Sequence, residues 1–285
     1  MHNKLLNFYS RYQHNYGTIR RYNNHTYKVT VFKTRVDTMP ELRTQSKRGT
    51  VNKKKLDNNI SRTRSTIYDI VASNSWDYFV TLTIDGAKHN REDLQAFEKD
   101  LQKMITNYNY NHKTSIRFLF IPEFHADKKS YHLHGLMSGF PENCLVRFTS
   151  DMHLPEYILQ KMKVGKEICY WKQYQERFGF CVVEPVENPE AVSAYMTKYI
   201  TEDLANTVQE LNAHSYFCSR GLKRSKIVHK GTLVKIPEAD FENEYVSIKT
   251  FSTREAAEQC FYEFEKGETE CFYQNILMSG LPANA

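Results

Sequence analysis

The chain has 285 residues, 40% of them hydrophobic and 13% aromatic, so it can bury a core and does not have the composition of a disordered protein. Its formal net charge of +6 is compatible with a nucleic-acid partner but does not identify one. The chain contains no apolar run of about 18 residues, no signal-like N-terminus and no Cys-x-x-Cys pair, so we expect no membrane span, no secretion signal and no zinc or disulfide framework.

Residues 1–58 form a basic, aromatic-rich segment, in which loose alternation predicts a short strand over Tyr27–Phe32. Between residues 43 and 64, eight Lys and Arg side chains accompany a single acid, Asp57. Such a run is either a solvated loop or a segment that contacts phosphates. Asn59–Val71 then has a helical apolar pattern, which leaves Arg62 and Arg64 on the other faces of the helix.

The next part of the chain alternates between strand and helix patterns. An amphipathic helix is predicted over Arg91–Tyr108, and Thr81 and Thr83 share one face of the strand before it. The predicted strands are Asp77–Ile84, Arg117–Phe124 and Tyr131–Met137. This order predicts an α+β fold with a central antiparallel sheet of the ferredoxin-like or split β-α-β type, in which helices pack on one face and leave the other open.

Two histidines lie two residues apart in the last of these strands. Because alternate side chains of a strand share a face, His132 and His134 point the same way. Two imidazoles on one face are either half-exposed strand residues or a pair of ligands for a divalent metal. A carboxylate could complete such a site, and the hairpin-like layout makes Glu123 the candidate, with His125 as the competing third ligand.

A second helix follows a region with weaker patterns. We expect a short helix over Leu154–Lys163, a loop-rich link through residues 167–178 and a strand over Gly179–Pro185. Asn188 suits the N-cap of the next helix and Pro189 its first position.

This next helix, predicted over Ala191–Ile200, carries two tyrosines. Tyr195 and Tyr199 are four residues apart, and Lys198 adjoins Tyr195 on the helix surface. In a chain with 19 tyrosines, a packed Tyr195 and a surface Tyr199 are the simpler interpretation when this segment is taken alone.

Three segments together carry a family resemblance. The strand Phe79–Ile84 with its Thr-Leu-Thr, the strand Tyr131–Leu136 with its His-Leu-His, and Tyr195–Tyr199 with its Tyr-Met-Thr-Lys-Tyr occur in this order. In this respect the chain resembles the HUH endonucleases, the rolling-circle replication initiators (Rep proteins) of phages, plasmids and small DNA viruses. The resemblance covers roughly residues 60–225.

The resemblance implies an enzyme that nicks and rejoins single-stranded DNA through a 5′-phosphotyrosine. It implies a magnesium or manganese ion held by Glu123, His132 and His134, with Tyr195 as the primary nucleophile, Tyr199 as a second one and Lys198 as the cation that favours the phenolate. It places the nuclease domain at residues 59–230. The DNA contacts that we expect are Arg62, Arg64, Thr81, Thr83, Arg220 and Lys223.

The C-terminal segment, residues 231–285, is expected to be a strand-helix extension. Patterns predict strands over Thr232–Ile236 and Glu244–Phe251 and a helix over Thr253–Lys266. No Walker-type phosphate-binding motif occurs, so a fused helicase is not expected. The expected partners are therefore single-stranded DNA or an origin hairpin, with a helicase and a polymerase of the bacterial host, in its cytoplasm and not at a membrane.

Two other classes of function remain open from the sequence. A non-catalytic protein that binds single-stranded nucleic acid would explain the charge and the tyrosines. Relaxases and transposases share the same motifs, although relaxases usually place the tyrosine before the histidines. A basic cluster with aromatic neighbours, Tyr216–Lys226, is either a DNA contact or a polar loop.

Overall fold

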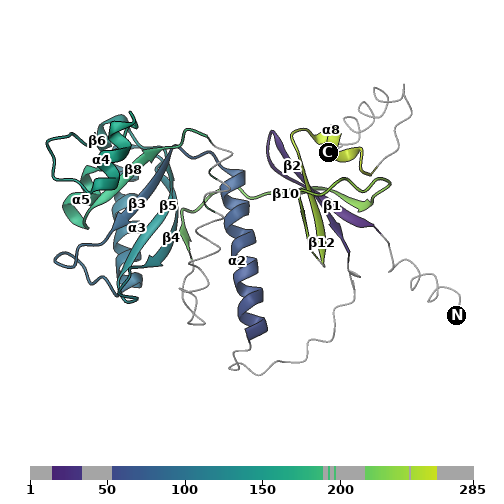
Figure 1. The fold of residues 1–285 in the computed structure, drawn as a ribbon, viewed down its shortest axis with the longest axis horizontal. Coiled ribbons are helices and arrows are strands. Elements are labelled where there is room, and N and C mark those ends of the chain that lie inside the picture. Colours follow the sequence, from purple (N-terminus) through teal and green to yellow (C-terminus); the bar gives the residue numbers. More distant parts are fainter. Residues whose placement is uncertain are drawn as a thin grey trace, which may run out of the picture. The chain divides into compact units, whose positions relative to one another are not determined.

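The computed structural model describes residues 15–33, 53–188, 192, 196, 216–243 and 245–261, without the side chains of residues 53–59, 61 and 142. The chain divides into two compact units (Figure 1). The central unit comprises Gly49–Arg224, and the terminal unit comprises Met1–Arg48 together with Ser225–Ala285. No helix in the described ranges is long and apolar enough to cross a membrane.

The central unit contains a sheet of seven strands, all of which pair antiparallel. Their order is β6-β7-β8-β3-β5-β4-β9. In chain order the strands are β3 (Tyr78–Thr83), β4 (Arg117–Phe124), β5 (Tyr131–Ser138), β6 (Leu145–Arg147), β7 (Cys169–Trp171), β8 (Cys181–Pro185) and β9 (Phe217–Cys218). The helices of this unit are α2 (Lys53–Ser73), α3 (Leu94–His112), α4 (Glu156–Lys163), α5 (Lys172–Arg177) and the short 3-10 helix η1 (Glu142–Cys144).

The centre of this sheet has the split β-α-β arrangement. Strands β3 and β4 both run antiparallel to β5, which lies between them, and α3 connects them. Helix α3 begins later than the apolar pattern indicated, because the side chain of Asp93 accepts a hydrogen bond from the backbone N–H of Ala96 and so caps the helix. The predicted α+β class with a central antiparallel sheet is confirmed.

One face of the sheet packs on α3 and α5. Phe97 and Leu101 of α3 and Tyr174 of α5 lie in one core cluster with Val80 and Leu133 of the sheet. These side chains are almost fully buried, so they anchor the strands whose opposite faces carry the predicted metal ligands.

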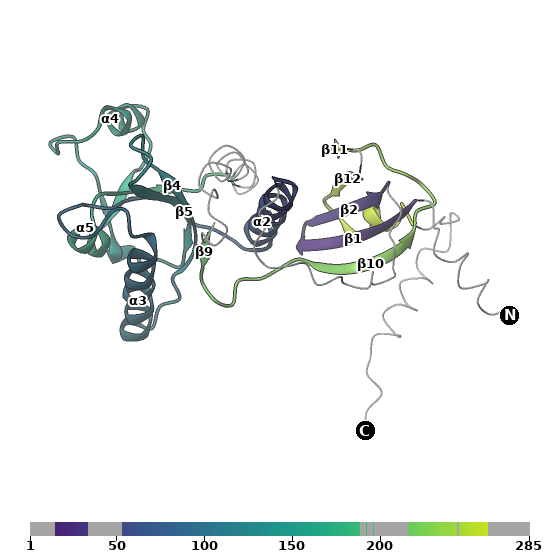
Figure 2. The same ribbon diagram turned by 90° about the horizontal axis from the view of Figure 1, so that it is seen from below.

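The opposite face is covered at two ends by different helices. At the β4–β5 end, Ile67 and Ile70 of α2 pack with Leu119, Leu136 and Met196. At the β8 end, Ile158 of α4 packs with Val182, and the ammonium of Lys161 lies 2.7 Å from both carboxylate oxygens of Glu184. In the views of Figures 1 and 2, α4 and α2 lie at separate places along the sheet.

The link at residues 167–178 was predicted to be loop-rich, but the structure has β7 and α5 there. Both elements are short, with three and six residues, so neither shows a full period of apolar alternation. Tertiary contacts hold them: Trp171 and Tyr174 are fully buried, and the Tyr174 hydroxyl donates to the carbonyl of Thr83.

The terminal unit joins strands from both ends of the chain in one five-stranded antiparallel sheet. The order is β10-β1-β2-β12-β11, formed by β1 (Tyr16–Asn23), β2 (Thr26–Phe32), β10 (Lys226–Thr232), β11 (Phe241–Glu242) and β12 (Val246–Phe251). The short helix α8 (Arg254–Glu258) follows, capped by the Thr253 hydroxyl. The segments 1–58 and 231–285 of the sequence prediction thus contribute strands to the same sheet.

The strand predicted over Thr232–Ile236 lies earlier in the chain, at Lys226–Thr232, where the sequence suggested a basic loop. It pairs with β1, which the sequence did not predict, and the N–H of Leu233 donates to the carbonyl of Asn15 at the end of this pairing. The helix predicted to run to residue 266 can be compared only as far as residue 261, beyond which the residues are not described.

Candidate metal centre

The β4–β5 hairpin positions three side chains that can bind a metal. Its register places Glu123 directly opposite His132, with His134 two residues further along the same face of β5. The connecting turn is ordered by Asp127, whose carboxylate accepts hydrogen bonds from the backbone N–H groups of Lys129 and Ser130 and from the Ser130 hydroxyl. This turn fixes the register on which the cluster depends.

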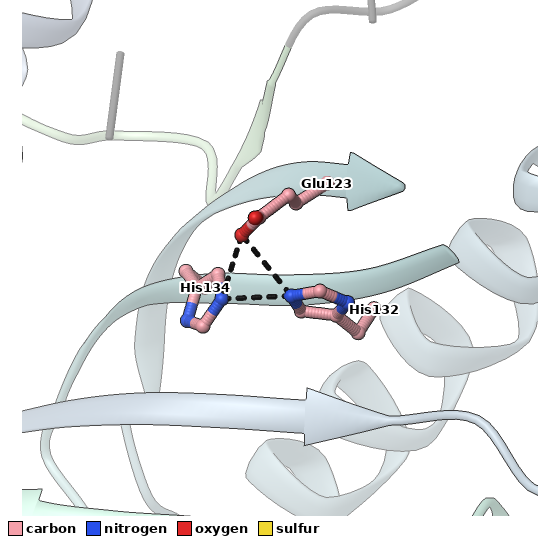
Figure 3. A group of neighbouring side chains, drawn as sticks. All are labelled: Glu123, His132 and His134. Atoms are coloured by element: carbon pink, nitrogen blue, oxygen red, sulfur yellow. Dashed lines mark hydrogen bonds and ion pairs between the residues drawn. The ribbon is translucent and has the colours of Figure 1, made fainter. Parts of the chain in front are cut away.

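The three side chains converge on one point (Figure 3). Oε2 of Glu123 lies 3.1 Å from Nε2 of His132 and 2.8 Å from Nε2 of His134. The two Nε2 atoms are 2.9 Å apart. Side-chain exposure is 24% for Glu123, 15% for His132 and 13% for His134, so the cluster is largely shielded but accessible from one side.

This donor set fits a divalent metal ion. An ion with ligand bonds of about 2.1 Å that takes three ligands at right angles separates their donor atoms by about 3.0 Å. The three observed separations of 2.8, 2.9 and 3.1 Å agree with that value. Three such ligands leave further coordination positions open. The residues present therefore fit a metal such as magnesium or manganese.

Two neighbours on β3 hold the ring of His134. The hydroxyl of Thr81 lies 3.2 Å from Nδ1 of His134, and the ring of Phe79 stacks on the imidazole with its centre 6.1 Å away. If Nδ1 carries the proton and donates it to Thr81, Nε2 presents a lone pair to the cluster. Thr83, on the same face of β3, pairs with His132 across the strands. Both threonines thus lie at the cluster, and their contact with DNA remains a prediction.

The acid of the cluster is held in its charged form. Hydrogen bonds with His132 and His134 lower the pKa of Glu123 to about 2, although burial acts in the opposite direction. The carboxylate therefore stays ionised throughout the neutral range, as a metal ligand must.

His125, the competing third ligand, takes a different place. Its ring meets that of His132 at a steep angle, with 4.5 Å between the ring centres, and it is not part of the three-residue cluster. Burial lowers the pKa of His125, and the nearby His132 and Arg91 lower it further. Of the two candidates, Glu123 is the one that meets both histidines.

The predicted nucleophile segment lies outside the described residues, so the structure gives no placement for Tyr195, Lys198 or Tyr199. Two helical residues of this segment, Val192 and Met196, are described, and the N–H of Val192 donates to the carbonyl of Asn188. Met196 is fully buried with Leu136 and Ile121, which share their sheet face with the metal cluster.

The predicted DNA-contacting arginines and lysine gather near α2. Arg62 is exposed and Arg64 half-exposed on this helix, and Arg220 and Lys223 are exposed in the loop after β9. The side chain of Asn74 connects the two segments, because it accepts from the N–H of Lys223 and donates to its carbonyl.

A second contact joins the same loop to α2. The guanidinium of Arg224 donates to the carbonyl of Thr66 and lies 3.9 Å from the carboxylate of Asp69. The other basic side chains of the run between residues 43 and 64 lie outside the described part of the chain.

Comparison with known families follows this geometry. Residues 77–204 match the model of a family of replication-associated proteins, the ORF2 type. The match covers less than half of the chain and includes the metal cluster and the Tyr-Met-Thr-Lys-Tyr motif. This segment is therefore similar to proteins that act in DNA replication. Searches of curated proteins and of solved structures gave no match.

Sequence reasoning found the metal ligands but missed the residues that hold them. Phe79 was noted only as the start of a strand, although its place two residues before Thr81 puts it on the same face. The pair Lys161–Glu184 gave no signal, because its members are 23 positions apart and lie on a helix and a strand of which only the strand has a clear pattern.

Proposed function

We propose that the protein nicks and rejoins single-stranded DNA at a specific site, and that it starts rolling-circle replication as an HUH-type endonuclease. The observation that carries this proposal is the convergence of Glu123, His132 and His134 within the segment that matches replication-associated proteins. A metal bound there would draw charge from a scissile phosphate and position it.

In this proposal Tyr195 is the nucleophile. Its phenolate oxygen attacks the scissile phosphorus, the bond between phosphorus and the 3′ oxygen breaks, and this oxygen leaves as a hydroxyl after taking up a proton. Lys198 favours the phenolate by its charge, since an isolated phenol has a pKa near 10. The reverse reaction rejoins the strand without an external energy source, because the phosphodiester energy is kept in the tyrosine ester.

The described neighbours of the motif agree with this assignment. Val192 and Met196 pack on the sheet face that carries the cluster. In the predicted helix, residue 195 lies three positions after Val192 and one before Met196, so it would flank the face of the helix that meets the sheet. Arg62, Arg64, Arg220 and Lys223 would hold the strand by its phosphates.

The freed 3′-hydroxyl would prime a polymerase. We propose that a helicase and a polymerase of a bacterial host act with the protein, in the cytoplasm of that host. The natural substrate in this proposal is single-stranded DNA or an origin hairpin.

The test is covalent capture on a denaturing gel. The full-length protein is mixed with manganese and a pool of short single-stranded DNAs, labelled at either the 3′ or the 5′ end. We expect an SDS-resistant protein band that carries the 3′ label only, because the 5′ phosphate stays on the tyrosine. The band should vanish with EDTA, with Tyr195→Phe and with Glu123→Gln, and persist with Tyr110→Phe, whose side chain is exposed on α3.

Other outcomes point elsewhere. If no adduct forms with a well-sampled pool and the protein still shifts DNA in a native gel, the protein is a non-catalytic binding module. If the adduct survives Tyr195→Phe and is lost with Tyr199→Phe, Tyr199 is the primary nucleophile. A band that carries only the 5′ label would indicate attack with the opposite polarity and contradict the proposed chemistry.

A further inference from the structure

The sheet of the terminal unit has two unlike faces. On one face, Ile19, Val29 and Val31 form a buried cluster with Ala257 of α8 and Phe261. Helix α8 is the only helix in the described residues of this unit, and it packs on this face. Within the described part of this unit, no helix packs on the other face.

The strand register shows which side chains form this second face. A complete row across all five strands runs through directly paired residues: Lys230, Thr18, Thr30, Ile248 and Phe241. The adjacent row contains Ile227, Arg20, Lys28 and Thr250. Beyond the other side of the complete row, the rings of Tyr16 and Phe32 stack with 6.3 Å between their centres. We call this surface the cationic face.

The cationic face carries positive charge without acids. Its paired strand residues include Arg20, Lys28 and Lys230 and, among the described residues, no Asp or Glu. The nearby Asp240, at the sheet edge, is bound by Lys249, which the register places towards the opposite face. The face is therefore net positive and attracts an anionic partner.

Aromatic and apolar groups lie between and beside these cations. Phe241 is 55% exposed and Ile227 is 41% exposed, which is unusual for such large apolar side chains. The Lys28 ammonium lies 5.5 Å from the ring centre of Tyr22, so this lysine spans an aromatic surface. Cations for phosphates beside rings for bases are the combination with which proteins bind single-stranded nucleic acid without reading its sequence.

We propose that the cationic face of the terminal unit binds single-stranded DNA, as a second contact surface separate from the metal cluster. The row from Lys230 to Phe241 crosses four strand spacings, or roughly 19 Å, which suits a short run of nucleotides. A duplex would hide its bases from Phe241, whereas a single strand exposes them for stacking. The choice of DNA rests on the proposed function, since the matched family acts in DNA replication.

The test measures binding of full-length protein to labelled oligo-dT of 30 nucleotides in EDTA, by fluorescence anisotropy at several salt concentrations. Lys28→Gln/Lys230→Gln removes two charges from the cationic face. Arg21→Gln/Lys226→Gln is the matched control, because these residues pair with each other on the same two edge strands but face the opposite way. Circular dichroism and thermal melting verify that both double variants are folded.

We expect the first double variant to bind about 25-fold more weakly at 0.1 M salt, from about fivefold for each lost phosphate contact. The slope of log affinity against log salt should become shallower by about 1.4, or about 0.7 for each charge. The control should stay within about threefold of the unmodified protein. Equal losses in the two double variants, or no loss in either, would overturn the proposal.

The aromatic part of the face is tested in the same way. Phe241→Ala should weaken binding by about fivefold or more, because stacking on a base is lost, whereas Tyr110→Ala on the central unit should not. Tighter binding of oligo-rU than of oligo-dT with the same lysine dependence would overturn the assignment to DNA.

This experiment is independent of the nicking chemistry. EDTA removes metal, and Tyr195→Phe should bind oligo-dT as the unmodified protein does. If no covalent adduct ever forms but the lysine variant loses affinity, the cationic face stands and the nuclease proposal does not. If the adduct forms and the lysine variant binds normally, the reverse holds.

Discussion

The two sheets of this protein use charged side chains in opposite ways. In the central unit, one carboxylate and two imidazoles meet within 3.1 Å because the β4–β5 register brings them together. In the terminal unit, Arg20, Lys28 and Lys230 are spread over three strands and do not converge. A converging site depends on strand register, whereas a spread surface tolerates small shifts.

This difference predicts unlike responses to the same kind of change. A substitution that disturbs the β4–β5 pairing should damage geometry and chemistry together. A substitution on the cationic face should lower affinity by an amount that adds to those of its neighbours.

The largest effect is expected from adding one carbon at a strand crossing. A Cβ on Gly135 would collide with the backbone carbonyl of Leu119 and come within 2.5 Å of the Phe120 ring, both in the paired strand. Gly135→Ala should therefore destabilise the central unit by about 1–3 kcal/mol and loosen the metal cluster. Hydrogen exchange of the β4 and β5 amides, followed by mass spectrometry, measures this locally.

Gly17→Ala makes the matching change in the terminal unit. There the added carbon would lie 2.6 Å from the end of the Leu233 side chain and 2.6 Å from the Thr30 carbonyl. Because the leucine can move, the loss should be smaller and confined to β1, β2 and β10. Gly86→Ala, which meets only the Arg91 side chain, is the mild control. Equal loss of protection in both units from either variant would contradict their independence.

A smaller effect is expected from the residue behind His134. Thr81→Val keeps the shape of the side chain but removes the hydroxyl 3.2 Å from Nδ1. Manganese affinity should fall about 10- to 100-fold, the usual cost of losing a partner that orients a metal-binding histidine. Isothermal titration calorimetry measures this affinity without any DNA.

Thr83→Val is the matched control for the calorimetry. It lies on the same face of the same strand and pairs with His132, but its hydroxyl has no part in the contact with His134. If both variants bound manganese equally well, the threonine would not hold the ligand. Binding of manganese unchanged by Glu123→Gln would count against the site itself.

The central fold and the metal ligands could be read from the sequence because they follow simple periods. Alternation over Arg117–Phe124 and Tyr131–Ser138 fixed the two strands, and the two-residue spacing put His132 and His134 on one face. The carboxylate could be narrowed only to a choice, because register across a turn depends on the turn geometry that Asp127 sets.

The terminal sheet could not be read in the same way. Its strands come from positions more than 190 residues apart, as the pairing of Ile19 with His229 shows, and nothing local announces such a pairing. Strand β10 contains lysines, a histidine and a glycine, so its composition indicated a loop. The cationic face exists only through this long-range register, which explains why the sequence did not reveal it.

The smallest predicted effect concerns the edge of the terminal sheet and its dependence on pH. Asp240 accepts hydrogen bonds from the Lys249 ammonium at 2.6 Å and from the N–H of Thr250 at 2.7 Å, and these bonds lower its pKa below the ordinary value of 3.8. A lowered carboxyl pKa stabilises the folded state above the unfolded value, and this stabilisation is lost as the pH falls through the folded value.

Asp240→Asn should therefore lower the Tm of the terminal unit by roughly 2–4 °C at pH 7, because the pair is largely exposed. The gap to the unmodified protein should narrow as the pH falls below about 3.8, where protonation removes the same charge in the unmodified protein. Glu238→Gln removes one nearby exposed charge and is the control. A gap that stayed constant from pH 7 to pH 3 would mean that the asparagine acts through lost hydrogen-bond geometry and not through charge. The edge of the cationic face would then be held by shape alone, in contrast to the charge-defined cluster of the central unit.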